Sequence, residues 1–398
     1  MPFALPFDLA EWLNLALRWL HLITGIAWIG SSFYFVWLDN HLKAPAAGEA
    51  SGEVWSVHGG GFYHKQKYQV APSTMPDELH WFKWEAYWTW MSGFSLLVLI
   101  YFFGARTFLI DASKAALNPV EASAIGLGTL AAGWIFYDQL CRPKLGKDDR
   151  LIGIIWFAFV ILTAYLLNGI FNPRGAYMLT GAMIGTVMVA NVFFIIIPKQ
   201  KKAVGQLIAG ETPDPALGKA GKQRSLHNNY MTLPVLFIML SHHYPMTYGA
   251  QRPWLVLALL SMTGIVIRHV FIQRHRGQRT GWTIFLACIL AYLSVAYVAL
   301  EKAGGAKAGG GGAVSYADIR PILEKHCTSC HSAHPTDAAF TSPPLGALLD
   351  SDTHASALAP KIKAMAVDSE VMPLGNLTGM TTEERAKLGD WIAQGAKE

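Results

Sequence analysis

The chain has 398 residues, of which 52% are apolar and only 15% are charged. Soluble domains carry about 25% charged residues, so this composition excludes an ordinary soluble protein and indicates a membrane protein with a soluble tail. The formal net charge of +5 is small, and no nucleic-acid partner is expected. Only Cys141 and Cys288 lie outside the two-cysteine motif described below, so no disulfide framework is expected.

Eight apolar runs are long enough to cross about 30 Å of hydrocarbon, which takes about 20 helical residues. They cover residues 12–38, 82–103, 121–140, 151–171, 175–197, 228–246, 253–272 and 281–300. The N-terminal segment MPFALPFDLAEW has no basic region, so it is interpreted as the start of an uncleaved first helix. The predicted fold class is all-α, with an eight-helix integral membrane domain over residues 1–300 and a small domain after it.

The connections between the runs differ in composition. Residues 39–80 are rich in Gly and His, and their HGGGFYHK segment is interpreted as a mobile lid or a plain loop. Residues 198–224 are predicted to form a polar loop. Residues 301–313, EKAGGAKAGGGGA, form a Gly-rich linker to the last domain, residues 314–398.

Lys and Arg are unevenly distributed between alternate connections. With the N-terminus outside, the inner connections 39–80, 141–150, 198–227 and 273–280 hold 16 basic residues. The outer connections 104–120, 172–174 and 247–252 hold 4. Because cytoplasmic loops carry the excess of Lys and Arg, both termini are expected outside the cytoplasm.

The tail contains a C-x-x-C-H motif at Cys327, Cys330 and His331, which is the attachment signature of a c-type haem. The two thiols bind the haem covalently and His331 ligates its iron, so residues 314–398 are predicted to be a small helical cytochrome c with one haem c. Met372, just before a proline in VMPLGN, is the expected second ligand. Met365 and Met380 remain alternatives, and a zinc knuckle or redox dithiol is the alternative for the whole motif.

The predicted spans contain polar side chains at two depths. At the outer side, His21 and His243 are candidate ligands of a haem b. The candidate catalytic and substrate-binding residues all lie at the inner ends of the second, sixth and seventh spans: Glu85, His227, Asn228, Tyr230, Arg268 and His269. These cationic, imidazole and amide groups suit a planar anion that forms hydrogen bonds. For each single histidine, a packed structural role is the alternative.

Long strings in the chain resemble the membrane-bound urate hydroxylases (urate oxidases) of bacterial purine breakdown. They are WLHLITGIAWIGSSFYFVWLD, HGGGFYHKQKYQVAP, LHWFKWEAYWTWMSG, HNNYMTLPVLFIMLSHHYP and IRHVFIQRHRG, together with the C-terminal cytochrome c fusion. The start of the first string also resembles small membrane haem b proteins, which supports His21 as a ligand. The family pattern has Asn at the position of His242, so His243 is the expected partner.

The resemblance implies oxidation of urate to 5-hydroxyisourate with water, and electron transfer through haem to the cytochrome c domain. A soluble cytochrome c or terminal oxidase of the respiratory chain is then the expected acceptor. The implied location is the bacterial inner membrane, with the N-terminus and cytochrome domain in the periplasm. The alternative function is a membrane-anchored cytochrome c subunit of a respiratory or quinol-oxidising complex.

Overall fold

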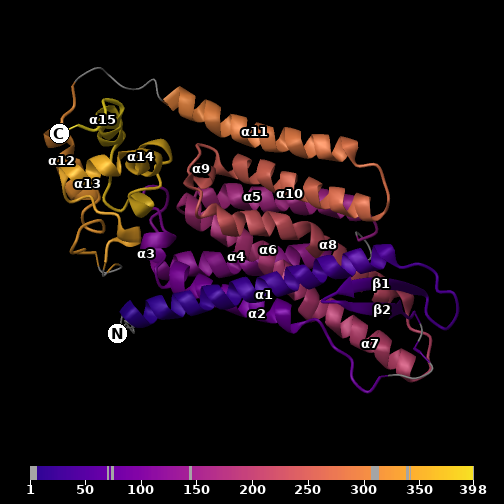
Figure 1. The fold of residues 1–398 in the computed structure, drawn as a ribbon. Coiled ribbons are helices and arrows are strands. Elements are labelled where there is room, and N and C mark those ends of the chain that lie inside the picture. The colour runs from indigo at the N-terminus through magenta and orange to yellow at the C-terminus, as the bar shows by residue number, and fades with distance from the viewer. Residues whose placement is uncertain are drawn as a thin grey trace.

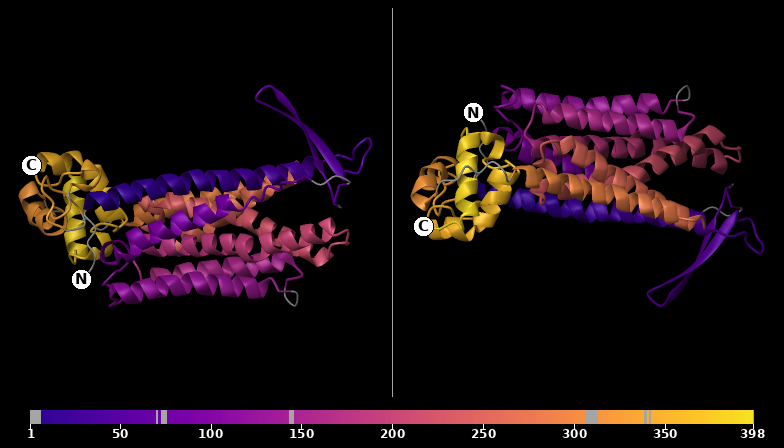
Figure 2. Two further views of the ribbon diagram at one scale, coloured as in Figure 1. Left: turned by 90° about the horizontal axis from the view of Figure 1, so that it is seen from below. Right: turned by 90° about the horizontal axis from the view of Figure 1, so that it is seen from above.

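The computed structural model describes residues 7–69, 71–72, 76–142, 146–305, 313–337, 340 and 342–397. Long helices lie side by side as a bundle, and a smaller helical domain lies at one end of it (Figure 1). The N-terminus lies at the same end as this C-terminal domain, and a strand pair lies at the opposite end (Figure 2). An even number of membrane crossings puts both ends of the chain on the same side, and this arrangement agrees with that.

The bundle consists of long helices with short ones between them. They are α1 (Phe7–His41), α2 (Trp84–Leu96) with the π-helix η1 (Leu97–Phe102), α3 (Ala105–Phe108), α4 (Pro119–Leu140), α5 (Asp149–Asn168), α6 (Pro173–Ala190) with the π-helix η2 (Asn191–Ile196), α7 (Ile197–Ile208), α8 (Pro215–Ser241), α9 (Pro245–Tyr248), α10 (Pro253–His275) and α11 (Gly281–Gly305).

Local sequence explains where several of these helices begin. Asn118, Asn172 and Asp214 each accept hydrogen bonds from first-turn backbone amides, and each is followed directly by proline. Asp148 caps α5 in the same way. A side-chain oxygen satisfies otherwise free backbone amides, while proline lacks the donor that the first turn leaves unpaired.

Six helices among the described residues are long and apolar enough to cross a membrane, which indicates a membrane protein. They are Leu9–His41, Pro119–Leu140, Asp149–Asn168, Pro173–Ile208, Pro253–His275 and Gly281–Glu301. The two other predicted spans, 82–103 and 228–246, are helical as α2–η1 and α8. In α2–η1, the α-helix changes to a π-helix at Leu97. In α8, the first half of the helix is polar.

Two predicted connections are ordered structure instead of loops. Residues 198–224 continue the helix to Ile208 and start α8 at Pro215, because polarity marks the end of a membrane span but not of a helix. The HGGGFYHK segment belongs to an antiparallel hairpin, β1 (Gly52–His58) with β2 (Gly61–Lys67). Gly59 and Gly60 form its turn with φ of 57° and 79°, as a type I′ turn requires.

The C-terminal domain has its own apolar core. Its elements are α12 (Tyr316–His326), the 3₁₀-helix η3 (Pro344–Gly346), α13 (Asp352–Ala357), α14 (Ala359–Ile362), the π-helix η4 (Lys363–Asp368), the 3₁₀-helix η5 (Leu374–Asn376) and α15 (Thr382–Ala393). Ile319, Leu388 and Trp391 are fully buried at its centre. Helix α11 extends through Gly305, so the first part of the predicted linker is helical, and residues 306–312 lie outside the described part.

Candidate functional site

Helix α8 brings four consecutive polar residues, residues 227–230, to the inner half of the bundle. Successive residues of an α-helix are rotated by about 100°, so these side chains cannot share one face. His227 and Asn228 face α4, α5 and α6, whereas Asn229 and Tyr230 face α1 and α10. The inner cluster predicted from the sequence is therefore two groups on different sides of α8.

The first group, here called the Arg224 group, consists of Asp138, Asn191, Arg224 and Asn228, with His227 beside it. The Arg224 guanidinium is only 4% exposed, donates to Asp138 Oδ1 at 2.8 Å and donates to Asn191 Oδ1 at 3.0 Å. Asn191 Nδ2 in turn donates to Asn228 Oδ1 at 2.8 Å.

The remaining amide is fully partnered, whereas the imidazole is hydrogen-bonded at Nδ1 and its buried Nε2 only approaches a carboxylate. Asn228 Nδ2 donates to the Met188 carbonyl oxygen at 2.9 Å. His227 Nδ1 lies 2.7 Å from the Tyr137 hydroxyl, and its Nε2 lies 3.4 Å from Asp149 Oδ1. Because its cation is neutralised and its amides pair with each other, the Arg224 group is a structural network.

The second group, here called the Arg268 group, consists of Phe33, Asn229, Tyr230, Arg268 and His269. The Arg268 side chain is buried at 2% exposure, and its Nε donates to Asn229 Oδ1. Its guanidinium carbon lies 3.9 Å from the centre of the Phe33 ring. Nη2 is buried without a hydrogen-bond partner, and no carboxylate within the described residues lies within 4.0 Å of this guanidinium.

The rest of the Arg268 group is fixed by hydrogen bonds across helices. Asn229 Nδ2 donates to Ser32 Oγ of α1 at 3.1 Å, which orients the amide oxygen towards Arg268. The Tyr230 hydroxyl lies 2.7 Å from His269 Nδ1. A buried cation without a counterion, next to an aromatic face, can bind a planar anion. The Tyr230–His269 pair adds an imidazole that can accept a proton on the adjacent helix position.

Of the predicted inner residues, the structure brings Tyr230 and His269 into contact, while Arg268 stands next to His269 in the chain and contacts Asn229 and Phe33. His227 and Asn228 belong instead to the network on the other side of α8. Glu85 lies in the first turn of α2, where its carboxylate is 4.0 Å from His80 Nε2.

Sequence reasoning missed Asn229 and Arg224. Asn229 stands between two residues that were singled out, and helix rotation could have assigned it to the face of Arg268. Arg224 was counted as a basic residue of the inner connection, yet it is buried; its position three residues before His227 was the available signal.

The outer histidines are His21 on α1 and the pair His242–His243 at the end of α8. His21 Nδ1 lies 2.9 Å from the Thr89 carbonyl oxygen, and the absence of a side chain at Gly93 allows the ring to approach α2. His242 Nδ1 lies 2.6 Å from the Met239 carbonyl oxygen, while its Nε2 is buried without a partner. His243 instead lines a cavity between the two domains. The haem b ligands stay a prediction, and this geometry favours His242 over His243.

The C-x-x-C-H residues follow directly after α12, so the end of this helix positions the thiols. His331 Nδ1 lies 3.0 Å from the Ala347 carbonyl oxygen, so a neutral ring carries its proton there and keeps the Nε2 lone pair for a metal. Cys327 and Met372 pack against the same apolar core, whereas Met380 is part of that core at 4% exposure. The donor set fits a c-type haem held by Cys327, Cys330, His331 and Met372.

The thiol environment argues against a redox dithiol. Burial raises the pKa of the Cys327 thiol to about 12, and burial also raises the pKa of Cys330. Reactive cysteine pairs need a lowered pKa to form a thiolate. No cluster of three or more His, Cys, Asp or Glu side chains suited to a metal ion occurs among the described residues.

Residues 8–299 match the family described as Urate oxidase N-terminal. The chain belongs to this family. The match includes the Arg268 group, the Arg224 group and the outer histidines, and it indicates a urate-related oxidoreductase. It does not extend to the C-terminal domain. No curated protein and no solved structure matches the chain.

Proposed function

We propose that this urate oxidase family member oxidises urate to 5-hydroxyisourate with water and passes the electrons through haem to its C-terminal domain. The observation that carries the proposal is the buried Arg268 cation, whose Nη2 has no partner. Burying an uncompensated charge costs several kcal/mol, by rough estimate, so such a group is retained where a ligand supplies the opposite charge.

Urate is planar and is a monoanion at neutral pH, which matches the Arg268 group in shape and charge. Arg268 would bind the anionic edge of the ring, and Phe33 offers an aromatic face beside that guanidinium. Glu85, His227 and Asn228, which were also expected at the substrate, are not needed for this arrangement.

The reaction balances as urate plus water giving 5-hydroxyisourate, two protons and two electrons. Water adds at C5 of the oxidised ring, so molecular oxygen is not a reactant. In the tautomer whose Nδ1–H donates to the Tyr230 hydroxyl oxygen, the ring of His269 is held in place and its Nε2 accepts one proton. This hydrogen bond makes Tyr230 a positioning residue for His269.

The C-terminal domain would hold one covalent haem c through Cys327 and Cys330, with His331 and Met372 as axial ligands. A haem accepts one electron at a time, so the two electrons leave urate in two steps. Arg385 Nη1 donates to the Met372 carbonyl oxygen at 2.7 Å, which fixes the loop that carries the proposed second ligand.

An intermediate carrier is needed because the two sites lie at opposite ends of the bundle. Arg268 is 15 residues from the outer end of α10 at Pro253, which corresponds to about 22 Å of helix. We propose a haem b at the outer histidines, with His21 and His242 as ligands in place of the pair His21 and His243. Both rings have Nδ1 at a backbone carbonyl, which leaves Nε2 for the iron.

The proposed location is the bacterial inner membrane, with the N-terminus and the C-terminal domain in the periplasm. The Lys and Arg bias of the connections supports this orientation, and both termini lie at one end of the bundle (Figure 2). A soluble cytochrome c or a terminal oxidase would then receive the electrons.

The test is anaerobic addition of urate to oxidised, purified protein while the α-band of haem c is followed. Reduction by urate, but not by a quinol, is the expected result. Reduction by quinol alone supports the alternative, a quinol-oxidising cytochrome subunit, and overturns the proposal. A pyridine haemochrome spectrum that contains haem c alone, from active protein, removes the proposed haem b.

A further inference from the structure

The C-terminal domain meets the membrane domain at two positions where a glycine allows close approach. A Cβ atom at Gly249, directly after α9, would collide with the Ser369 side chain and lie 2.7 Å from the Ser369 carbonyl oxygen. A Cβ atom at Gly375 would lie 2.6 Å from the Ile110 carbonyl oxygen. Backbone therefore packs on backbone at both contacts, one glycine coming from each domain.

The receiving surface on the membrane domain is rigid. Ile110 pairs with Phe171 in an isolated β-bridge, and the Asn172 amide donates to the Leu109 carbonyl oxygen at 3.0 Å. Lys114 Nζ donates to the Phe171 carbonyl oxygen at 2.9 Å. The segment after α3 is thus fixed to the start of α6, and α9 stands beside it.

The docking segment of the C-terminal domain, residues 369–376, contains the proposed iron ligand at its centre. Ser369 and Gly375 each stand three residues from Met372. The Met372 amide donates to the Met365 carbonyl oxygen at 2.9 Å, so this segment is also tied to its own domain. The contact therefore places the segment that carries Met372 against the membrane domain, where Ser369 and Glu370 line the same cavity as His243.

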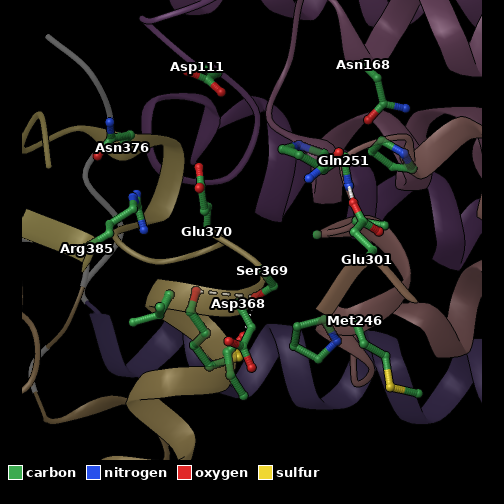
Figure 3. A pocket seen from close by; sticks show the side chains of 18 of the residues that line it. Asp111, Asn168, Met246, Gln251, Glu301, Asp368, Ser369, Glu370, Asn376 and Arg385 are labelled. Atoms are coloured by element: carbon green, nitrogen blue, oxygen red, sulfur yellow. Dashed lines mark hydrogen bonds between the residues drawn. The ribbon is translucent and has the colours of Figure 1, made fainter. Parts of the chain in front are cut away.

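The interface beside the two glycine contacts is open. A cavity of about 1190 Å³ lies there, lined on one side by residues such as His243 and Trp254 and on the other by Asp368, Arg385 and Asp390. Figure 3 shows Ser369 and Glu370 of the C-terminal domain on one side of it and Asn168 of the membrane domain on the other. Small contacts with poorly packed surroundings are typical of interfaces that form and release.

We infer that residues 369–376 are a docking surface for the platform formed by Ile110 and Gly249, and that this docked pose is the one in which the C-terminal domain receives electrons. The inference rests on the proposed function for the electron transfer, but the docking itself can be measured without urate. In this inference, Gly249 and Gly375 are positioning residues for the C-terminal domain.

The first test locks the docked pose with a disulfide. Gly249→Cys and Ser369→Cys are introduced into the full chain with Cys141→Ser and Cys288→Ser, and a protease site is placed in the Gly-rich linker. Because Cβ atoms in disulfides lie about 3.5–4.5 Å apart, the C-terminal domain must move back by about 1–2 Å. After oxidation and linker cleavage, the two halves should stay joined on a non-reducing gel.

The matched control pairs Gly249→Cys with Thr353→Cys, an exposed position of α13 outside the cavity lining. This pair should separate after cleavage. Equal joining of both pairs, or no joining of either, overturns the docking surface.

The second readout is the rate at which urate reduces haem c in the locked protein. The reference is the same variant with its engineered disulfide reduced and its two cysteines alkylated. After desalting, its haem is oxidised again before urate is added. The rate in the locked protein should at least equal that of the reference, because the alkylated side chain at position 249 disfavours the docked pose. A locked protein that urate no longer reduces, while the released one is reduced, overturns the electron-receiving pose. Failure of urate to reduce the wild type refutes the proposed function instead, and leaves the cross-linking result standing.

A steric variant tests the same contact without a cross-link. Gly249→Ala should lower the rate of haem c reduction by about 10-fold, because overpacking a contact of this kind disfavours the docked pose. Ser369→Gly removes the opposing Cβ and should restore part of the rate in the double variant, because the Ser369 carbonyl oxygen stays in place. Gly128→Ala, which enters open space on α4, is the control. A defect that Ser369→Gly does not relieve is local to α9 and overturns the inference.

Discussion

Two buried arginines lie on opposite sides of α8 and differ in what surrounds them. Arg224 has a carboxylate, Asp138, at 2.8 Å and an amide oxygen at 3.0 Å. Arg268 has an amide oxygen and an aromatic face but leaves Nη2 unpaired. Both are almost fully buried, at 4% and 2% exposure, so burial alone does not reveal function. The difference in partners identifies Arg224 as structural and Arg268 as the candidate for binding an anion.

The largest expected effect is on folding, from Arg224→Gln. Removal of the cation leaves the Asp138 carboxylate with only the more distant Arg142, and it leaves the amide oxygen of Asn191 without its donor. The free energy of unfolding should fall by about 3 kcal/mol. Thermal unfolding in detergent measures this loss. Asp138→Asn added to the same chain should recover part of it. A stable Arg224→Gln protein with a raised KM for urate would reverse the roles of the two arginines.

The next effect is on substrate binding, from Arg268→Gln. Loss of a charge-assisted hydrogen bond should raise the KM for urate by about 10- to 100-fold. The variant should be at least as stable as the wild type, because it removes a buried charge that lacks a counterion. Steady-state kinetics and thermal unfolding of the same preparation test both statements. An unchanged KM refutes the binding role.

The two neighbouring asparagines give a smaller, matched contrast. Asn229→Ala removes the amide that orients Arg268, and should raise the KM for urate by about 3- to 10-fold. Asn228→Ala breaks the pairing with Asn191 and should lower the unfolding temperature while the KM stays unchanged. The opposite pattern would place the substrate on the α6 side of α8.

The smallest effect concerns a paired ion at the surface of the C-terminal domain. The Thr381 backbone amide, with Lys325 and His326, lowers the pKa of Glu384 to about 2. Since the folded pKa lies below the unfolded value of about 4.3, the contribution of Glu384 is complete above that value. It is lost as the pH falls towards 2.

Glu384→Gln should therefore reduce the stability of the C-terminal domain at neutral pH, and the difference from wild type should shrink below pH 4 or so. Unfolding of the full-length protein, followed through the absorbance of haem c, measures it. A stability difference between Glu384→Gln and the wild type that does not change with pH contradicts a lowered pKa of Glu384.

Short-range features of the sequence predicted much of the architecture. Apolar runs located the helices, and the C-x-x-C-H motif indicated a small helical domain. Thr381 and Glu384 form a capping box, and the C-x-x-C-H motif follows α12. Each of these depends on neighbouring residues along the chain. The same reasoning misjudged residues 52–67 and 198–224, where polarity was taken for a lack of regular structure, although hairpins and surface helices are polar as well.

The sequence by itself determined which chemistry this protein carries: apolar spans, buried imidazoles and guanidinium groups, and a tail with haem ligands. The tertiary structure decided which of these groups act together. One turn of α8 sends neighbouring residues towards different helices, so Asn228 meets Asn191 while Asn229 meets Arg268. Whether a buried cation is neutralised depends on a carboxylate 86 positions away along the chain, and only packing brings that carboxylate into contact.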